Sequence, residues 1–107
     1  MITVKNSIIP FGKYKAINLF GLVFYKKSAK MTEADFNHER IHTSQMRELL
    51  YIPFYIWYGI EYFIRLIRCG NARKAYRGTC FEYEAYKNEK NLDYLKTRKH
   101  YCWIKFV

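Results

Sequence analysis

Two histidines four residues apart, His38 and His42, constrain the fold of this chain more than any other feature of its sequence. Residues at this spacing share one face of an α-helix, so both imidazoles can bind one metal ion if the segment is helical. Thr32 is a suitable N-terminal cap, and acidic residues follow it where the helix dipole favours them. The pattern therefore predicts a helix over residues 32–50 with both histidines on one face.

Glu39 completes the pattern His-Glu-x-x-His between these histidines. On a helix it is offset from His38 by about 100°. It would therefore lie beside a bound metal and accept a proton from a water there. Two imidazoles with this spacing suit Zn²⁺, which in catalytic sites has three protein ligands and one open position. The alternative is a helix with two surface histidines and a solvated carboxylate.

A third ligand must come from elsewhere in the chain. The metzincin motif continues with Gly and His after the second histidine, and here those positions hold Gln45 and Glu48, which excludes that class. The remaining histidine, His100, lies in a basic tail and is a poor candidate. A carboxylate on a later helix is therefore expected.

Residues 82–86, Glu-Tyr-Glu-Ala-Tyr, resemble the third-ligand segment of gluzincin metallopeptidases, particularly the CAAX prenyl protease and heat-shock membrane protease families. The pattern of those families is Glu, an aromatic residue, any residue, Ala and Asp. The resemblance covers only the two metal-binding segments. It implies that Glu82 binds zinc together with His38 and His42, and that Glu39 is the general base.

One position departs from the pattern, because Tyr86 stands where the families have an Asp that orients a zinc-binding histidine. A neutral phenol is a weaker partner, so another carboxylate is expected to take this role. The candidates are Glu84 and Glu89. Glu89 shares the helical face of Glu82, whereas Glu84 is about 200° away around the helix. An ordinary solvated carboxylate is the alternative interpretation of Glu82.

Tyr76 is a second candidate catalytic residue, in the basic connector 73–77. Its phenol can stabilise the oxyanion of a tetrahedral intermediate, although a packing role is the simpler interpretation. Arg73, Lys74 and Arg77 can bind a substrate carboxylate or a lipid phosphate, or form a solvated face.

The chain as a whole predicts one α+β domain over residues 1–107, and the resemblance implies that this domain is zincin-like. Residues 1–27 contain β-prone runs separated by glycine and proline, which predict a hairpin or small sheet. An edge strand of that sheet can bind an extended peptide. Three helices are expected after the sheet, over residues 32–50, 53–68 and 79–96.

Residues 53–68 form the most apolar segment, with Glu61, Arg65 and Arg68 in one polar stripe. As a membrane-spanning helix the segment is short and charged. As an interfacial helix it has Trp57 and several tyrosines for the headgroup level, and basic flanks that suit anionic lipid. Core packing and membrane contact are both consistent with the sequence.

The formal net charge of +10 suits an anionic partner, either lipid or nucleic acid. Nucleic acid is disfavoured because no recognised binding signature is present. The three cysteines form no C-x-x-C pair, and the first residues do not resemble a signal peptide. We therefore expect a cytoplasmic protein, peripheral at the membrane if residues 53–68 face lipid.

These features predict a zinc-dependent metallopeptidase that acts on a peptide or protein. Two alternatives follow from the same residues. One is a non-catalytic module that zinc stabilises and that binds an anionic membrane surface. The other is a basic nucleic-acid-binding protein that carries the motif by chance.

Overall fold

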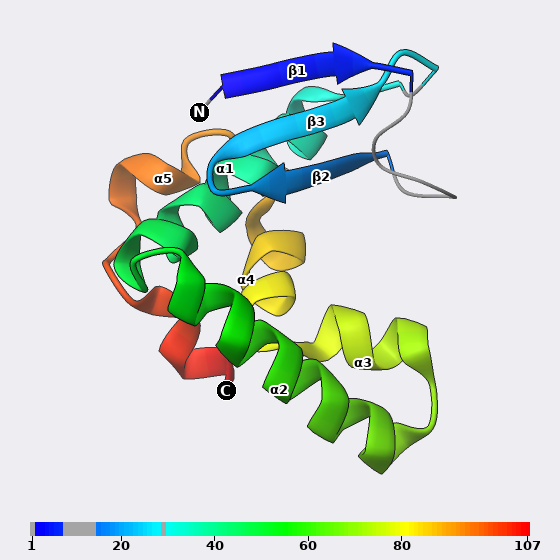
Figure 1. The fold of residues 1–107 in the computed structure, drawn as a ribbon. Helices are drawn as coiled ribbons and strands as arrows, with labels where there is room; N and C mark the ends of the chain where they lie inside the picture. Colours follow the sequence, from blue (N-terminus) through cyan, green and yellow to red (C-terminus); the bar gives the residue numbers. More distant parts are fainter. Residues whose placement is uncertain (1, 8–14, 29) are drawn as a thin grey trace.

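The computed structural model describes three ranges of the chain, residues 2–7, 15–28 and 30–107. A small sheet is followed by a helical body, which confirms the predicted α+β class (Figure 1). Met1 and residues 8–14 of the predicted β-rich segment lie outside the described residues.

The sheet has three strands, β1 (Ile2–Asn6), β2 (Ala16–Leu19) and β3 (Leu22–Lys26), in the order β1-β3-β2. β2 and β3 form the predicted hairpin, and Leu19 is paired with Leu22. Phe20 and Gly21 connect them with positive φ angles of 56° and 89°. A type I′ turn requires positive φ at both central residues, and Gly21 adopts it without strain. β1 pairs with β3 in parallel.

The described helices are α1 (Glu33–Glu48), α2 (Ile52–Cys69), α3 (Ala72–Gly78), α4 (Cys80–Asn88), α5 (Tyr94–Thr97) and the 3₁₀ helix η1 (Cys102–Phe106). There are more of them than the three expected. The prediction of a connector at residues 73–77 is wrong, because these residues belong to α3. Asn71 caps that helix by accepting a hydrogen bond from the backbone N–H of Lys74.

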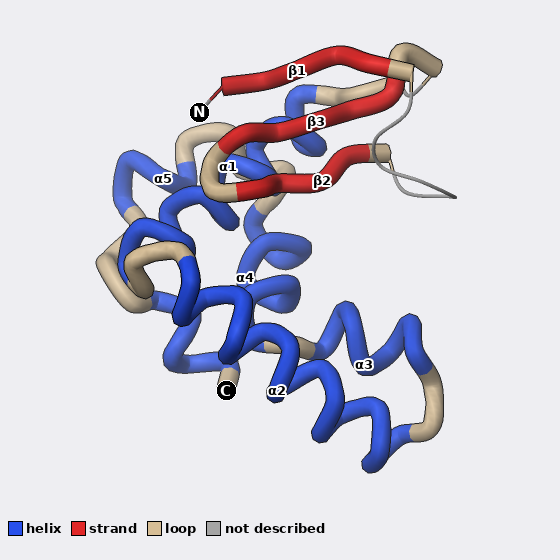
Figure 2. Tube along the Cα trace, in the orientation of Figure 1, coloured by secondary structure: helices blue, strands red, loops and turns tan. Residues whose placement is uncertain are grey.

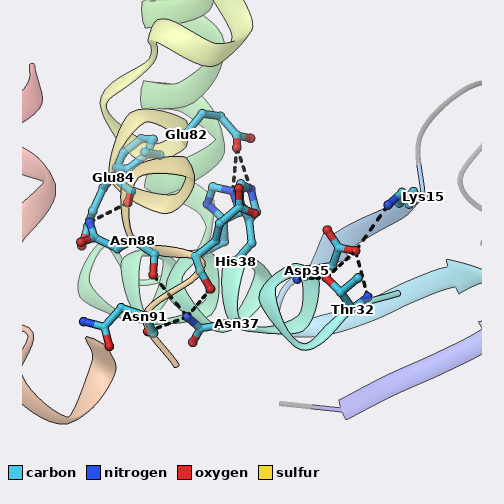
Figure 3. A network of polar contacts seen from close by, with 12 residues as sticks. Lys15, Thr32, Asp35, Asn37, His38, Glu82, Glu84, Asn88 and Asn91 are labelled. Carbon is cyan, nitrogen blue, oxygen red and sulfur yellow. Dashed lines mark hydrogen bonds and ion pairs between the residues drawn. The ribbon is translucent and has the colours of Figure 1, made fainter. Parts of the chain in front are cut away.

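The helix predicted over residues 79–96 is also too long, because α4 ends at Asn88. The reason lies on α1, where the side-chain amide of Asn37 faces the end of α4 (Figure 3). Its Nδ2 donates to the carbonyls of Glu89 and Asn91, each at 2.9 Å. Carbonyls bound in this way fix a turn after α4, and the chain forms the separate short helix α5.

Threonine side chains cap the first turns of α1 and α4, and the cap predicted at Thr32 is confirmed. Thr32 Oγ1 accepts from the N–H of Asp35 at 3.1 Å, and Asp35 accepts in return from the N–H of Thr32 at 2.9 Å. This reciprocal capping box fixes the start of α1. Thr79 likewise accepts from the N–H of Glu82 and caps α4.

Two different kinds of packing hold the helices together. The apolar core gathers Met46, Phe54, Cys80, Phe81 and Trp103, and these residues join α1, α2, α4 and η1. The stripe of α1 that faces α4 is instead largely polar. The sheet lies over the N-terminal half of α1, and α2 and α3 extend away on the other side (Figure 2).

The packing of α2 confirms the core interpretation of residues 53–68 for one side of the helix only. Its inner side contributes Phe54 to the core, whereas much of its outer side is apolar and exposed. Within the ranges of the chain described above, no helix combines the length and apolar character needed to cross a membrane.

Candidate metal centre

Two imidazoles and one carboxylate meet between α1 and α4 (Figure 3). Nε2 of His38 and Nε2 of His42 lie 3.1 Å apart. Oε1 of Glu82 lies 3.0 Å from the first and 2.9 Å from the second. All three side chains are buried. The structure thus brings together the three predicted ligands, and the group that they form can hold a metal ion.

The separations of these atoms suit a small tetrahedral cation. Zinc binds nitrogen and carboxylate oxygen at about 2.0–2.2 Å, so ligand atoms around it lie about 3.3 Å apart. The three observed separations, 3.1, 3.0 and 2.9 Å, are only a few tenths of an ångström shorter. A small outward rotation of the side chains would therefore accommodate the ion.

Gln45 determines which nitrogen of His42 carries a proton. Its Nε2 donates to the carbonyl of Phe81 at 3.0 Å and to Glu84 at 2.9 Å, so its Oε1 must accept. That oxygen lies 2.8 Å from Nδ1 of His42, which therefore donates. In the neutral ring, Nε2 then directs a lone pair at the Glu82 oxygen. Two such acceptors repel each other unless a cation lies between them, either a proton or a metal ion.

The pKa shifts of His42 and Glu82 agree with the need for a cation between them. Burial lowers the pKa of His42, but the adjacent Glu82 carboxylate outweighs it and leaves that pKa raised. Burial raises the pKa of Glu82, but His42 and His38 outweigh it and hold that pKa well below its ordinary value. Without a metal, a proton on His42 thus balances the carboxylate. Zinc must displace this proton, so its binding should strengthen as pH rises.

Glu39 lies next to the group without being one of its ligands. Burial raises the pKa of the Glu39 carboxyl, and Glu82 adds to this, whereas His42 and His38 partly offset it. The segment is also tied to the sheet, because Nδ2 of Asn18 on β2 donates to the backbone carbonyl of Glu39 at 3.0 Å. The carboxylate of Glu39, the general base expected from the sequence, therefore interacts electrostatically with all three ligands.

The other two ligands, His38 and Glu82, also have partners outside the motif. The hydroxyl of Tyr58 on α2 donates to Oε2 of Glu82 at 2.7 Å, which leaves Oε1 directed at the histidines. A carboxylate oxygen of Glu89 lies 3.4 Å from Nδ1 of His38, at ion-pair distance but without hydrogen-bond geometry. Glu89 therefore favours the proton on Nδ1 of His38 and the lone pair on its Nε2.

The other two residues expected to orient a histidine have different positions. Tyr86 packs the edge of its ring against His38, with the ring centroids 4.5 Å apart. Glu84 is fully buried on the far side of Gln45 and reaches His42 only through that amide.

Tyr76 lies in a cluster of phenols beside Glu82. Its ring centroid is 6.4 Å from those of Tyr58 and Tyr86. Burial raises the pKa of Tyr76, and the Glu82 carboxylate raises it further. Its hydroxyl therefore stays protonated at neutral pH, as a hydrogen-bond donor to an oxyanion must. The guanidinium of Arg77 lies over the Tyr86 ring, 4.2 Å from its centroid.

Sequence reasoning missed Gln45 and Tyr58 as partners of the ligands. Gln45 follows His42 by three residues, so the helical spacing was a usable signal. Tyr58 gave no such signal, because its contact with Glu82 depends on how α2 packs against α4.

Two open surface hollows lie away from His38, His42 and Glu82, which we call the metal group. Each has a volume of about 510 Å³. They share Ser44, Arg47 and Leu95 as lining residues, and neither is lined by a ligand of the group.

Comparison with known proteins does not assign the chain to a family: no family model, curated protein or solved structure matches it. The evidence for function therefore comes from the residues themselves.

Proposed function

We propose that the protein is a zinc-dependent metallopeptidase. The observation that carries this proposal is the convergence of His38, His42 and Glu82, whose ligand atoms all lie within 4.8 Å of one another, next to Glu39. When bound, zinc would supply a Lewis acid that activates water and polarises a peptide carbonyl.

The residues of the chain have separate roles in this proposal. His38 and His42 hold the metal through Nε2, because their Nδ1 atoms face Glu89 and Gln45. The carboxylate of Glu39 accepts the proton of the attacking water and returns it to the leaving amine nitrogen. A carboxyl with a raised pKa suits this task, because its carboxylate is a stronger base than that of an ordinary glutamate.

The substitution Glu39→Gln tests the proposal, because glutamine keeps the size of the side chain and removes its basicity. Peptidase activity should fall by about a hundredfold or more, while zinc content stays unchanged. Activity is measured on an unstructured protein substrate, and zinc by elemental analysis. Glu33→Gln is the matched control, since Glu33 is an exposed acid on the same helix.

Two results would contradict the peptidase assignment. One is undiminished activity in Glu39→Gln. The other is loss of zinc from that variant, which would make Glu39 a ligand and leave no base.

A second candidate is a non-catalytic module in which zinc fastens α1 to α4. The low exposure of His38, His42 and Glu82 (7%, 5% and 4%) favours it. The same experiment separates the two, because a zinc-loaded protein with no activity in wild type or Glu39→Gln supports the module.

A further inference from the structure

The outer side of α2 is apolar and is not covered by any other part of the described chain. Six large side chains there are between 44% and 69% exposed: Ile52, Ile56, Ile60, Phe63, Ile64 and Ile67. Trp57 is 38% exposed at the edge of the same surface. At 100° per residue these positions occupy an arc of about 140° with no charged residue in it. We call this set of seven residues the α2 face.

Two polar side chains of α2, Tyr58 and Glu61, are directed into the protein, whereas Arg68 near the end of the helix is exposed. Glu61 is the only acidic residue of the helix, and its Oε2 accepts from Nε of Arg65 and from the backbone N–H of Cys80, each at 2.9 Å. Tyr58 donates to Glu82 from the same inner side. The helix is therefore amphipathic in an unusual sense, since its polar side binds the protein and its apolar side faces outward.

A patch of this kind indicates an interaction surface. Monomeric proteins leave single apolar side chains exposed, but they rarely leave a contiguous group of this size along one helix. Nothing in the folding of α2 requires it, because Phe54 and the inner polar contacts already hold the helix in place. The α2 face is therefore available to a partner outside the described residues.

The charge around the face identifies that partner. Positions 49–81 contain five basic residues and one acidic residue, and the acidic one is Glu61, which is turned inward. Arg68, at the edge of the arc, and Arg73 and Lys74 on α3 are exposed. Two copies of a chain with net charge +10 would repel each other at this surface, whereas an anionic surface would be attracted to it.

We propose that the α2 face docks onto an anionic lipid surface, with α2 lying in the plane of the headgroups. The isoleucines and Phe63 would enter the boundary of the acyl chains, Trp57 would lie at its edge, and the exposed arginines would contact lipid phosphates. This inference goes beyond the proposed function and does not depend on metal binding. Because Tyr58 projects from the opposite side of α2, docking would set the metal group roughly one helix diameter, about 10 Å, from the lipid.

The test is co-sedimentation of the full chain with vesicles of phosphatidylcholine alone or mixed with phosphatidylglycerol. Wild type should bind the anionic vesicles in preference, and the binding should weaken as salt rises. Ile60→Ser/Phe63→Ser should lower the partition coefficient by about tenfold or more. The matched control is Ile2→Ser/Leu92→Ser, which removes apolar side chains of comparable exposure outside the face.

A second pair of variants tests the charge contribution. Arg68→Gln/Arg73→Gln and Lys27→Gln/Lys30→Gln remove the same charge from exposed positions, but only the first pair lies beside the face. The first pair should weaken binding to anionic vesicles more than the second.

Three results would overturn the proposal. The first is no binding of wild type to anionic vesicles. The second is equal binding by wild type and Ile60→Ser/Phe63→Ser. The third is a dimer, measured by light scattering, that this double substitution converts to monomer, because a second copy would then cover the face. Circular dichroism and the melting temperature establish that the variants are folded.

Discussion

Two buried polar clusters join α1 to its neighbours, and they differ in where their positive charge comes from. In the first, Arg98 binds Glu48 through Nη1 at 2.7 Å and Nη2 at 3.0 Å, and it also binds Glu84. All three of these side chains are at most 5% exposed. The second cluster is the metal group. No lysine or arginine of the described residues is bonded to its carboxylate.

Gln45 connects the two clusters, because it accepts from His42 and donates to Glu84. They therefore form one polar seam along α1. Burying a carboxylate is costly unless a cation compensates it. In the first cluster Arg98 provides that cation permanently, whereas the metal group needs a proton or an ion from solution. The first cluster is thus structural, and the second can respond to metal.

The largest effect is expected from removing the internal cation. Arg98→Met would leave Glu48 and Glu84 buried without compensation, so we expect the free energy of unfolding to fall by about 3–5 kcal/mol. Urea denaturation measures this value. Lys96→Met is the matched control, because the Lys96–Asp93 pair is 79% and 75% exposed and should contribute at most about 1 kcal/mol.

The difference in the free energy of unfolding between wild type and Arg98→Met should also depend on pH. Burial raises the pKa of Glu48, but Arg98 outweighs it and holds that pKa below its ordinary value of 4.5. This contribution to stability is present above pH 4.5 and is lost as pH falls through the pKa of the folded protein. The gap between wild type and Arg98→Met should therefore narrow in acid. A gap that widens there would contradict the assigned pairing.

Zinc should have the next largest effect, and it should act on the second cluster alone. Adding free zinc at about 100 times its dissociation constant should raise the free energy of unfolding by about 3 kcal/mol. Denaturation with zinc and with a chelator measures the difference. His38→Ala/His42→Ala should show no response to zinc, while Arg98→Met should keep the full response. An equal response in both variants would mean that zinc binds elsewhere.

The smallest effect is expected from the support that α2 gives to the metal group. Tyr58→Phe removes the hydrogen bond to Oε2 of Glu82, so zinc affinity should fall by about tenfold. Competition with a chromophoric chelator measures it. Tyr62→Phe, one turn further along α2, should leave the affinity unchanged. Equal zinc affinity in Tyr58→Phe and Tyr62→Phe would show that Tyr58 does not support zinc binding.

Much of the fold could be predicted from local sequence signals. The caps Thr32 and Thr79 and the turn at Gly21 act within a few residues, so their patterns are readable directly. The end of α4 could not be predicted, because Asn37 fixes it from more than fifty residues away. The helix at residues 73–77 was not predicted, because the basic residues there were interpreted as a connector and Asn71 was not recognised as a cap.

The ligands of the metal group were more predictable than the residues around them. The helical spacing of the histidines and the resemblance at Glu82 supplied all three. Glu89 could be inferred because it repeats the face of Glu82. The contacts of Tyr58 and Arg98 arise only when α2 and the C-terminal segment pack against α1 and α4. A periodic pattern within one segment therefore cannot predict them.

The zinc content of the purified protein tests the central claim most directly. We expect one zinc ion per chain in wild type after dialysis against zinc-containing buffer, one in Glu39→Gln, and none in His38→Ala/His42→Ala. Elemental analysis beside an accurate protein concentration gives each ratio. Wild-type protein that takes up no zinc, although it is folded and its histidines are intact, would contradict the claim.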